Sequence, residues 1–244
     1  MSPLLAALGL SVLGSLGGLF VASGLLLFPD SVRSRLIPWL VSYAVGALLG
    51  VALLALLPEA LGLLTPPRVF EAVLAGILLF FVLEKLVLWR HCHTDDCHVH
   101  GAAASLVLIG GAFHNFVDGA MIGTAVVTSL PLGVSTALAV AAHEVPQEVG
   151  NFAVLLHGGY SRQRALLLNV LSGICGVAGA LLAVLVVHVA PLAKPYLLCI
   201  AAASFLYIAM ADLIPDLHSG RIEGGPFRQL VLVALGIATA MFVL

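Results

Sequence analysis

Residues 102–128 read AAASLVLIGGAFHNFVDGAMIGTAVVT, a stretch long enough to cross a bilayer as a helix. It nevertheless carries His114, Asn115 and Asp118 near its centre. The whole chain of 244 residues is 61% hydrophobic and 9% charged, which is too apolar for a soluble domain. Because ionisable side chains at membrane depth are costly, they indicate a functional site. The stretch therefore predicts a membrane helix that carries part of such a site.

Comparable apolar stretches recur along the chain and predict an all-α integral membrane protein, with a single polytopic domain over 1–244 and eight transmembrane helices. The predicted helices cover residues 4–28, 36–64, 70–89, 102–128, 132–157, 165–189, 196–214 and 227–244. The first stretch has no basic region before it and no clear cleavage-site pattern. We therefore expect a retained helix rather than a signal peptide.

The basic residues predict the orientation of these helices. Eight of the ten follow predicted helices 1, 3, 5 and 7 or end them: Arg33, Arg35, Lys85, Arg90, Arg162, Arg164, Arg221 and Arg228. Only Arg68 and Lys194 fall on the other side. Since positive charge accumulates in cytoplasmic connections, we expect both termini to be extracytoplasmic.

Two strings of similar sequence suggest an internal repeat. Residues 55–61 read ALLPEAL at the end of helix 2, and residues 211–217 read ADLIPDL at the end of helix 7. In the orientation above, these two ends face opposite sides of the membrane. An inverted repeat of helices 1–3 and 6–8 around a central hairpin of helices 4 and 5 would produce that relation. Chance recurrence of a proline and an acid near a helix end is the alternative.

A second polar string, HEVPQE at residues 143–148, lies in helix 5. Residues four apart share a helix face, so His114 lies with Asp118 on helix 4 and His143 with Gln147 on helix 5. The predicted turn between the helices is short, at about 129–133. At about 1.5 Å of rise per residue, Asp118 is level with His143, and His114 with Gln147. The two helices can therefore close around one point near the middle of the bilayer.

The chemistry of these side chains favours a transition metal. Imidazole together with carboxylate suits Zn²⁺ better than Mg²⁺ or Ca²⁺, which prefer oxygen-only shells. Asn115 and Glu144 each directly follow one of the two His residues. Their side chains therefore point to an adjacent side of the helix and offer a second set of oxygen ligands. Amides bind metals weakly, so Asn115 and Gln147 argue against a permanent structural metal site. Weak ligands suit a site that has to release its ion. Pro146 also leaves the Ala142 carbonyl without its helical donor. Interhelical hydrogen bonding is the alternative, but it explains a single polar residue better than two tight clusters.

The two strings resemble the signature of the ZIP (Zrt/Irt-like) family of divalent metal transporters, whose fourth and fifth helices carry HNxxDG-type and HExPxE-type motifs. The likeness extends into residues 149–156 and 80–93 and includes the eight-helix layout with both termini outside. The resemblance implies uptake of Zn²⁺ into the cytoplasm across the cell (inner) membrane, with iron, manganese or cadmium as further candidates. It also implies a homodimer.

The resemblance implies metal ligands at seven positions: His114, Asn115, Asp118, His143, Glu144, Gln147 and Glu148. A first site would use both His, Asp118 and Gln147, and a second Asn115, Glu144 and the shared Asp118, with Gln147 as a weaker bridge. The branch of the family with a longer HExPHE motif has His where Gln147 stands, and it usually has Asp where Asn151 stands. We therefore expect a less charged site with less strict zinc selectivity.

A polar loop, HCHTDDCHVH at residues 91–100, lies between helices 3 and 4. The loop, predicted over 91–101 in the cytoplasm, offers reduced thiols and imidazoles that can capture or sense metal near the exit. Its candidate ligands are His91, Cys92, His93, Cys97, His98 and His100. Their spacing does not match a four-ligand zinc finger, and an incidental polar loop is the alternative.

Two other functions agree with parts of the sequence. An intramembrane zinc-dependent hydrolase needs a second His in HExxH, and Gln147 stands there. A proton-coupled carrier without bound metal would use the carboxylates as relays, but the His/Cys loop argues against it. We therefore predict a transporter rather than an enzyme, with divalent metal ions and the lipid bilayer as its partners. The net charge of −2 gives no indication of a nucleic-acid partner.

Overall fold

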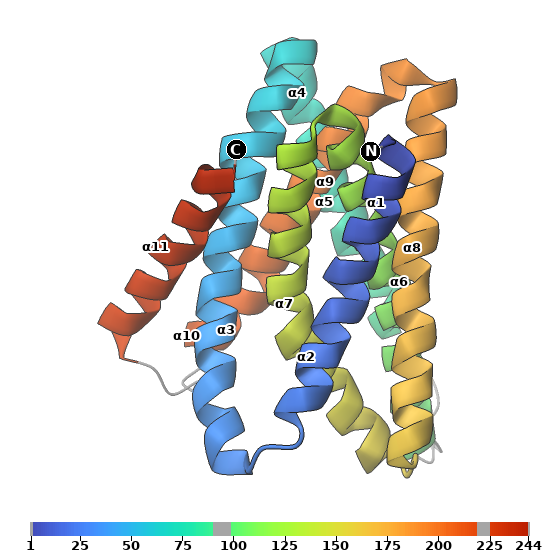
Figure 1. Cartoon of the computed structure of the whole chain (residues 1–244), viewed down its shortest axis with the longest axis vertical. Coiled ribbons are helices and arrows are strands. Elements are labelled where there is room, and N and C mark those ends of the chain that lie inside the picture. Colours follow the sequence, from blue (N-terminus) through green and yellow to red (C-terminus); the bar gives the residue numbers. More distant parts are fainter. Residues whose placement is uncertain (1, 90–98, 219–224, 244) are drawn as a thin grey trace.

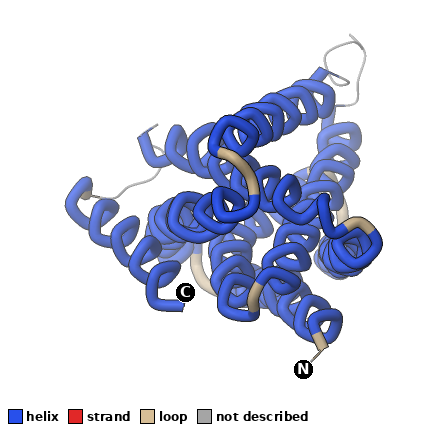
Figure 2. Tube along the Cα trace, turned by 90° about the horizontal axis from the view of Figure 1, so that it is seen from above, coloured by secondary structure: helices blue, strands red, loops and turns tan. Residues whose placement is uncertain are grey.

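The computed structural model of the chain describes residues 2–89, 99–218 and 225–243 and consists of helices joined by short connections (Figures 1 and 2). In chain order the elements are α1 (Pro3–Ser11), η1 (Val12–Leu16), α2 (Gly17–Leu25), α3 (Asp30–Val51), η2 (Ala52–Leu56), α4 (Leu57–Leu63), α5 (Pro66–Trp89), α6 (Val99–Thr128), α7 (Leu130–His157), α8 (Arg162–Val189), η3 (Pro191–Ala193), α9 (Lys194–Tyr207), η4 (Ile208–Leu213), α10 (Ile214–His218) and α11 (Pro226–Val243). Helices satisfy all their backbone hydrogen bonds internally, as a segment in lipid requires. The all-α class predicted from the apolar stretches is confirmed.

Six segments of the described chain are long and apolar enough to cross a membrane: Pro3–Leu25, Ser34–Leu63, Pro66–Lys85, Arg162–Val189, Pro191–Leu213 and Pro226–Val243. The two other long helices, α6 and α7, contain the polar strings. All eight predicted stretches contain helix, although the first ends at Leu25 rather than at residue 28 and the second at Leu63 rather than at residue 64, and eight crossings stay a prediction.

Some helices begin at other residues than predicted, because a proline or a capping residue sets the start of the helix. Helix α3 begins at Asp30, directly after Pro29, and so includes residues predicted to be a loop. Helix α6 begins at Val99, inside the predicted loop 91–101. Only Ser129 separates α6 from α7, and its hydroxyl accepts a hydrogen bond from the Leu132 amide at 3.3 Å. Since Pro131 fits the first turn of a helix, α7 can start at once.

The two strings that suggested a repeat have the same local irregularity. A π-helical turn, η2 in one and η4 in the other, precedes the helix that contains Pro58 or Pro215. A proline has no amide hydrogen, so the preceding helical turn loses one donor and a local π-helical adjustment is favoured. The shared irregularity agrees with the suggested repeat.

Helix pairing follows the pattern that the repeat predicts. Helix α3 packs along α11, and α5 packs along α9. In the predicted numbering these pairs are helices 2 and 8 and helices 3 and 7. Exchanging helices 1–3 with helices 6–8 turns the first pair into the second. Likewise α6 packs along α8, and α7 along α2 with η1. Helix α7 also contacts α3 and α6, which places it inside the bundle (Figure 1). The repeat itself stays a prediction.

The backbones of α6 and α8 are in direct contact. A Cβ added to Gly119 would lie 1.7 Å from the Gly176 carbonyl oxygen, and one added to Gly179 would lie 1.9 Å from the Phe116 carbonyl oxygen. Such small-residue contacts let two membrane helices approach closely. The contact therefore fixes the depth of α6, which carries half of the polar site, against α8.

Candidate metal site

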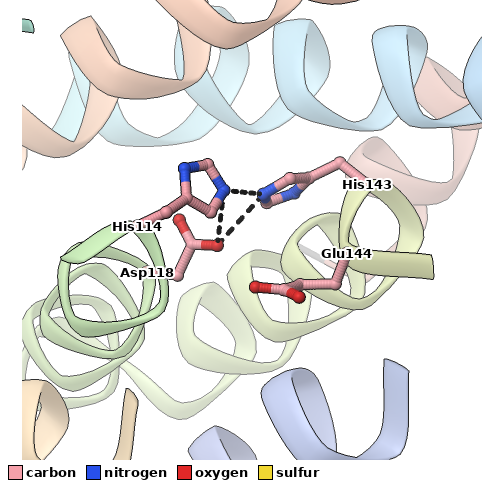
Figure 3. A group of neighbouring side chains, drawn as sticks. All are labelled: His114, Asp118, His143 and Glu144. Atoms are coloured by element: carbon pink, nitrogen blue, oxygen red, sulfur yellow. Dashed lines mark hydrogen bonds and ion pairs between the residues drawn. The ribbon is translucent and has the colours of Figure 1, made fainter. Parts of the chain in front are cut away.

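Four of the predicted ligands converge between α6 and α7 (Figure 3). His114 and Asp118 come from successive turns of α6, and His143 and Glu144 are neighbours on α7. Each side chain offers one donor atom, and these four atoms lie within 4.8 Å of one another. The predicted depth match between Asp118 and His143 is confirmed, because their side chains are in contact.

Three donor atoms form a small triangle. The Nε2 atoms of His114 and His143 are 3.1 Å apart, and Asp118 Oδ2 lies 3.0 Å from His143 Nε2 and 3.4 Å from His114 Nε2. A tetrahedral Zn²⁺ with ligand bonds of about 2.0–2.1 Å separates its ligand atoms by about 3.3–3.4 Å. The triangle therefore already has nearly the dimensions of one face of a zinc coordination shell. The sequence placed His114 level with Gln147, whereas its ring also reaches His143.

The orientation of His143 is fixed by its surroundings. Its Nδ1 lies 3.1 Å from the carbonyl oxygen of Ala139, one turn earlier on α7. A hydrogen bond donated from Nδ1 leaves the lone pair of Nε2 directed at His114 and Asp118. The ring also packs edge-on against Phe205 of α9, with centroids 6.4 Å apart. Both contacts hold the imidazole in a position suited to a ligand.

The two carboxylates of the site are fully buried. Asp118 Oδ2 lies next to the Nε2 atoms of His114 and His143, and neither carboxylate oxygen of Glu144 accepts a hydrogen bond within the described residues. Burying an unpaired carboxylate is costly, and a bound cation removes that cost. The electrostatics of the site therefore favour a divalent cation.

The other predicted ligands in the two helices lie differently. Asn115 is buried and donates from Nδ2 to Ser172 Oγ of α8 at 3.1 Å. Glu148 is buried, and its Oε1 accepts a hydrogen bond from Asn151 Nδ2 at 3.3 Å. Gln147 is half-buried on α7. The metal-binding roles of all seven residues stay predictions.

His114 connects the site with a cavity. Its side chain is 23% exposed, whereas those of Asp118 and His143 are buried. The cavity has a volume of about 240 Å³, and its lining includes His114, Glu84, Ser204, Tyr207 and Asp212. The Tyr207 hydroxyl donates to the Glu84 carboxylate. An ion at His114 would therefore be next to an acidic, partly polar cavity between α5, α6 and the α9–η4 segment.

Apart from His114, none of the cavity residues named above was predicted to belong to a site. Glu84 was noted only within residues 80–93, and Asp212 only within the suggested repeat. The signal that pointed to Asp118, an acid inside an apolar helix, also applies to Glu84 and could have found it. Nothing in the sequence indicates that Tyr207 contacts Glu84 of α5 or that Phe205 contacts His143 of α7.

The predicted loop ligands His91, Cys92, His93, Cys97 and His98 lie outside the described residues. His100 belongs to the first turn of α6, where the structure does not describe its side chain. The role of the loop stays a prediction.

Comparison with known proteins gives a consistent result. The sequence model of the family described as "ZIP Zinc transporter" matches residues 88–244. The zinc transporter ZIP4 of Homo sapiens is 30% identical and aligns with 80% of this chain and 41% of its own length. The zinc transporter ZIP13 of Pongo abelii is 31% identical, with 93% of this chain and 75% of its own length covered.

The zinc transporter ZIP10 of Homo sapiens is 34% identical over 61% of this chain and 20% of its own length. The chain thus spans about two fifths of the length of human ZIP4 and less of human ZIP10. Together with the apolar helices, these similarities identify a multi-pass membrane protein.

Proposed function

The chain belongs to the ZIP zinc transporter family, and from this premise we propose that it carries Zn²⁺ through a site formed by α6 and α7. The observation that carries this proposal is the triangle of His114 Nε2, His143 Nε2 and Asp118 Oδ2, whose edges of 3.0–3.4 Å suit a tetrahedral zinc ion. Glu144 supplies a fourth ligand and the second negative charge. Two carboxylates neutralise a divalent cation, which lowers the cost of holding it at membrane depth.

We propose that transport runs toward the cytoplasm across the cell (inner) membrane, with both termini outside. The supporting observations are the excess of basic residues at one end and the cavity beside His114. Glu84 and Asp212 in that cavity lie on the segments that lead to this basic end, so the cavity provides an acidic route away from the site. Iron, manganese and cadmium are further candidate substrates, because Gln147 and Asn115 make the site less selective than an all-imidazole set. A homodimer is part of the same expectation.

The hydrolase alternative is set aside. ZIP proteins are transporters and not enzymes, and the helix that would carry HExxH has Gln147 in place of the second His. The proton-coupled carrier without metal differs from our proposal in one measurable property, which is metal binding by the purified protein.

Uptake of radioactive zinc into proteoliposomes tests the proposal. We expect the wild-type protein to accumulate the ion and the Asp118→Ala and His143→Ala variants to lose uptake, since each removes one corner of the triangle. Glu71→Ala, at an exposed acid near the start of α5, is the matched control and should retain uptake. Unchanged uptake in both site variants would show that the ion passes elsewhere. Absence of zinc binding and uptake in the wild type would overturn the function itself.

A further inference from the structure

We propose that Ser172 of α8 is a positioning residue for the metal site: its hydroxyl holds the Asn115 amide in the orientation that presents the amide oxygen as a ligand. The inference rests on the proposed function and adds a third helix to a site otherwise built from α6 and α7. It assigns to Ser172 a part in metal preference.

The hydrogen bond between the two side chains carries the argument. Asn115 Nδ2 donates to Ser172 Oγ at 3.1 Å, and the two residues are 0% and 6% exposed. Because the amide nitrogen is directed at α8, the amide oxygen Oδ1 lies on the opposite branch of the side chain. This oxygen is buried and has no hydrogen-bond partner. An unpaired acceptor is costly to bury, and a cation would satisfy it.

Asn115 is placed to supply that oxygen to the site. It follows His114 directly and precedes Asp118 by three residues, so its side chain is a neighbour of Asp118 on the surface of α6. If the amide rotated by half a turn, its oxygen could still accept from the Ser172 hydroxyl, but its NH₂ group would lose the Glu148 carboxylate as an acceptor and would repel a cation. The orientation of a single side chain therefore decides whether this position attracts or repels the ion.

The packing of α6 on α8 fixes Ser172 opposite Asn115. Three successive turns pair residues with the same offset of 57: Asn115 with Ser172, Gly119 with Gly176, and Gly123 with Ala180. A Cβ on Gly123 would lie 2.6 Å from the Ala180 carbonyl oxygen, so the contact stays close beyond Gly119. Since the backbones touch, neither helix can slide to bring another residue to Asn115. The serine position is imposed by the same contact that sets the depth of α6.

The expected consequence is specific to the metal. Zn²⁺ can rely on the imidazoles and carboxylates, whereas Mn²⁺ depends more on oxygen ligands. Loss of a residue that orients a ligand typically costs about 10–100-fold in metal affinity. For Ser172→Ala we therefore expect the dissociation constant for Mn²⁺ to rise about tenfold and that for Zn²⁺ about two- to threefold.

The test measures Zn²⁺ and Mn²⁺ binding by calorimetry, with uptake of both ions into proteoliposomes, in the full-length purified protein. The variants are Ser172→Ala, Ser172→Thr, Asn115→Ala and the double variant Asn115→Ala/Ser172→Ala. Ser42→Ala is the matched control, because Ser42 is also fully buried but donates to the Pro38 carbonyl of its own helix, α3. We expect Ser172→Thr, which keeps the hydroxyl, to retain the wild-type ratio of the two metals. In the Asn115→Ala background, Ser172→Ala should have no further effect on either metal.

Each other outcome overturns the inference in a recognisable way. If Ser172→Ala lowers the affinities for both metals equally, or behaves like Ser42→Ala, Ser172 acts only in packing and the proposed function stands. If the effects of Asn115→Ala and Ser172→Ala on metal affinity add in the double variant, Ser172 does not act through Asn115. If the wild-type protein binds neither metal, the proposed function fails and the inference with it.

Discussion

Two acid–base pairs of this protein have similar chemistry and very different surroundings. Asp118 and His143 lie 3.0 Å apart between α6 and α7 with side chains 0% and 1% exposed. Glu59 and Lys194 lie 3.8 Å apart near the ends of α4 and α9 with side chains 43% and 23% exposed. Water and salt screen the second pair, while the first is shielded from both. The two pairs therefore differ mainly in burial, and the pair in the proposed site is the buried one.

The buried pair carries the largest expected effect. Asp118→Asn keeps the shape of the side chain but removes the charge, so the site loses one of its two carboxylates and its shared ligand. We expect zinc affinity to fall by more than about 100-fold, beyond the range typical of residues that only orient a ligand. Calorimetry with Zn²⁺ on the purified protein measures the change. Glu59→Gln, which removes the same charge from the exposed pair, should leave zinc affinity within about twofold.

The second prediction concerns the contact that holds the buried pair in place. Gly119→Ala puts a Cβ 1.7 Å from the Gly176 carbonyl oxygen, so α6 and α8 must move apart. We expect a loss of at least about 1–3 kcal/mol in stability, with reduced uptake. Thermal unfolding in detergent measures it. Gly150→Ala on α7 is the control, because nothing lies within 4 Å of the added Cβ, and equal melting temperatures for the two variants would contradict the prediction.

The third prediction is a smaller effect in the opposite direction, a gain in zinc affinity from an added ligand at the buried site. Gln147→His adds an imidazole four residues after His143, on the same face of α7. Imidazole binds Zn²⁺ better than an amide does, so zinc affinity should rise about tenfold, whereas Mn²⁺ should gain little. Competition between the two ions for uptake tests this difference. An equal gain for both metals would indicate that residue 147 does not contact the ion.

The exposed pair carries the smallest expected effect. Lys194→Ala removes the partner of Glu59, and such partly exposed pairs contribute about 0–1 kcal/mol, less in salt. We expect the melting temperature and zinc uptake to remain near those of the wild type. A loss of uptake comparable to that of Asp118→Asn would mean that the N-terminal end of α9 takes part in transport, and the contrast between the two pairs would fail.

Much of the architecture follows from the apolar stretches. Each predicted stretch is helical over most of its described length because a segment in lipid must satisfy its own backbone. The polar strings predict that α6 and α7 carry the site, and the contact between Asp118 and His143 agrees with that prediction. The boundaries at Pro29 and Val99 were missed, because caps and neighbouring helices set them as much as hydropathy does.

Helix rise and a short turn fix relative depth, so the meeting of Asp118 and His143 could be predicted from the sequence. The sequence gives no sign that His114 also reaches His143, that Phe205 packs against this ring, or that Ser172 faces Asn115, and these contacts appear first in the folded bundle. These contacts join helices far apart in the chain. The rotation and separation of such helices depend on side-chain packing, and above all on the backbone contact at Gly119 and Gly176, which no periodicity within one helix reveals.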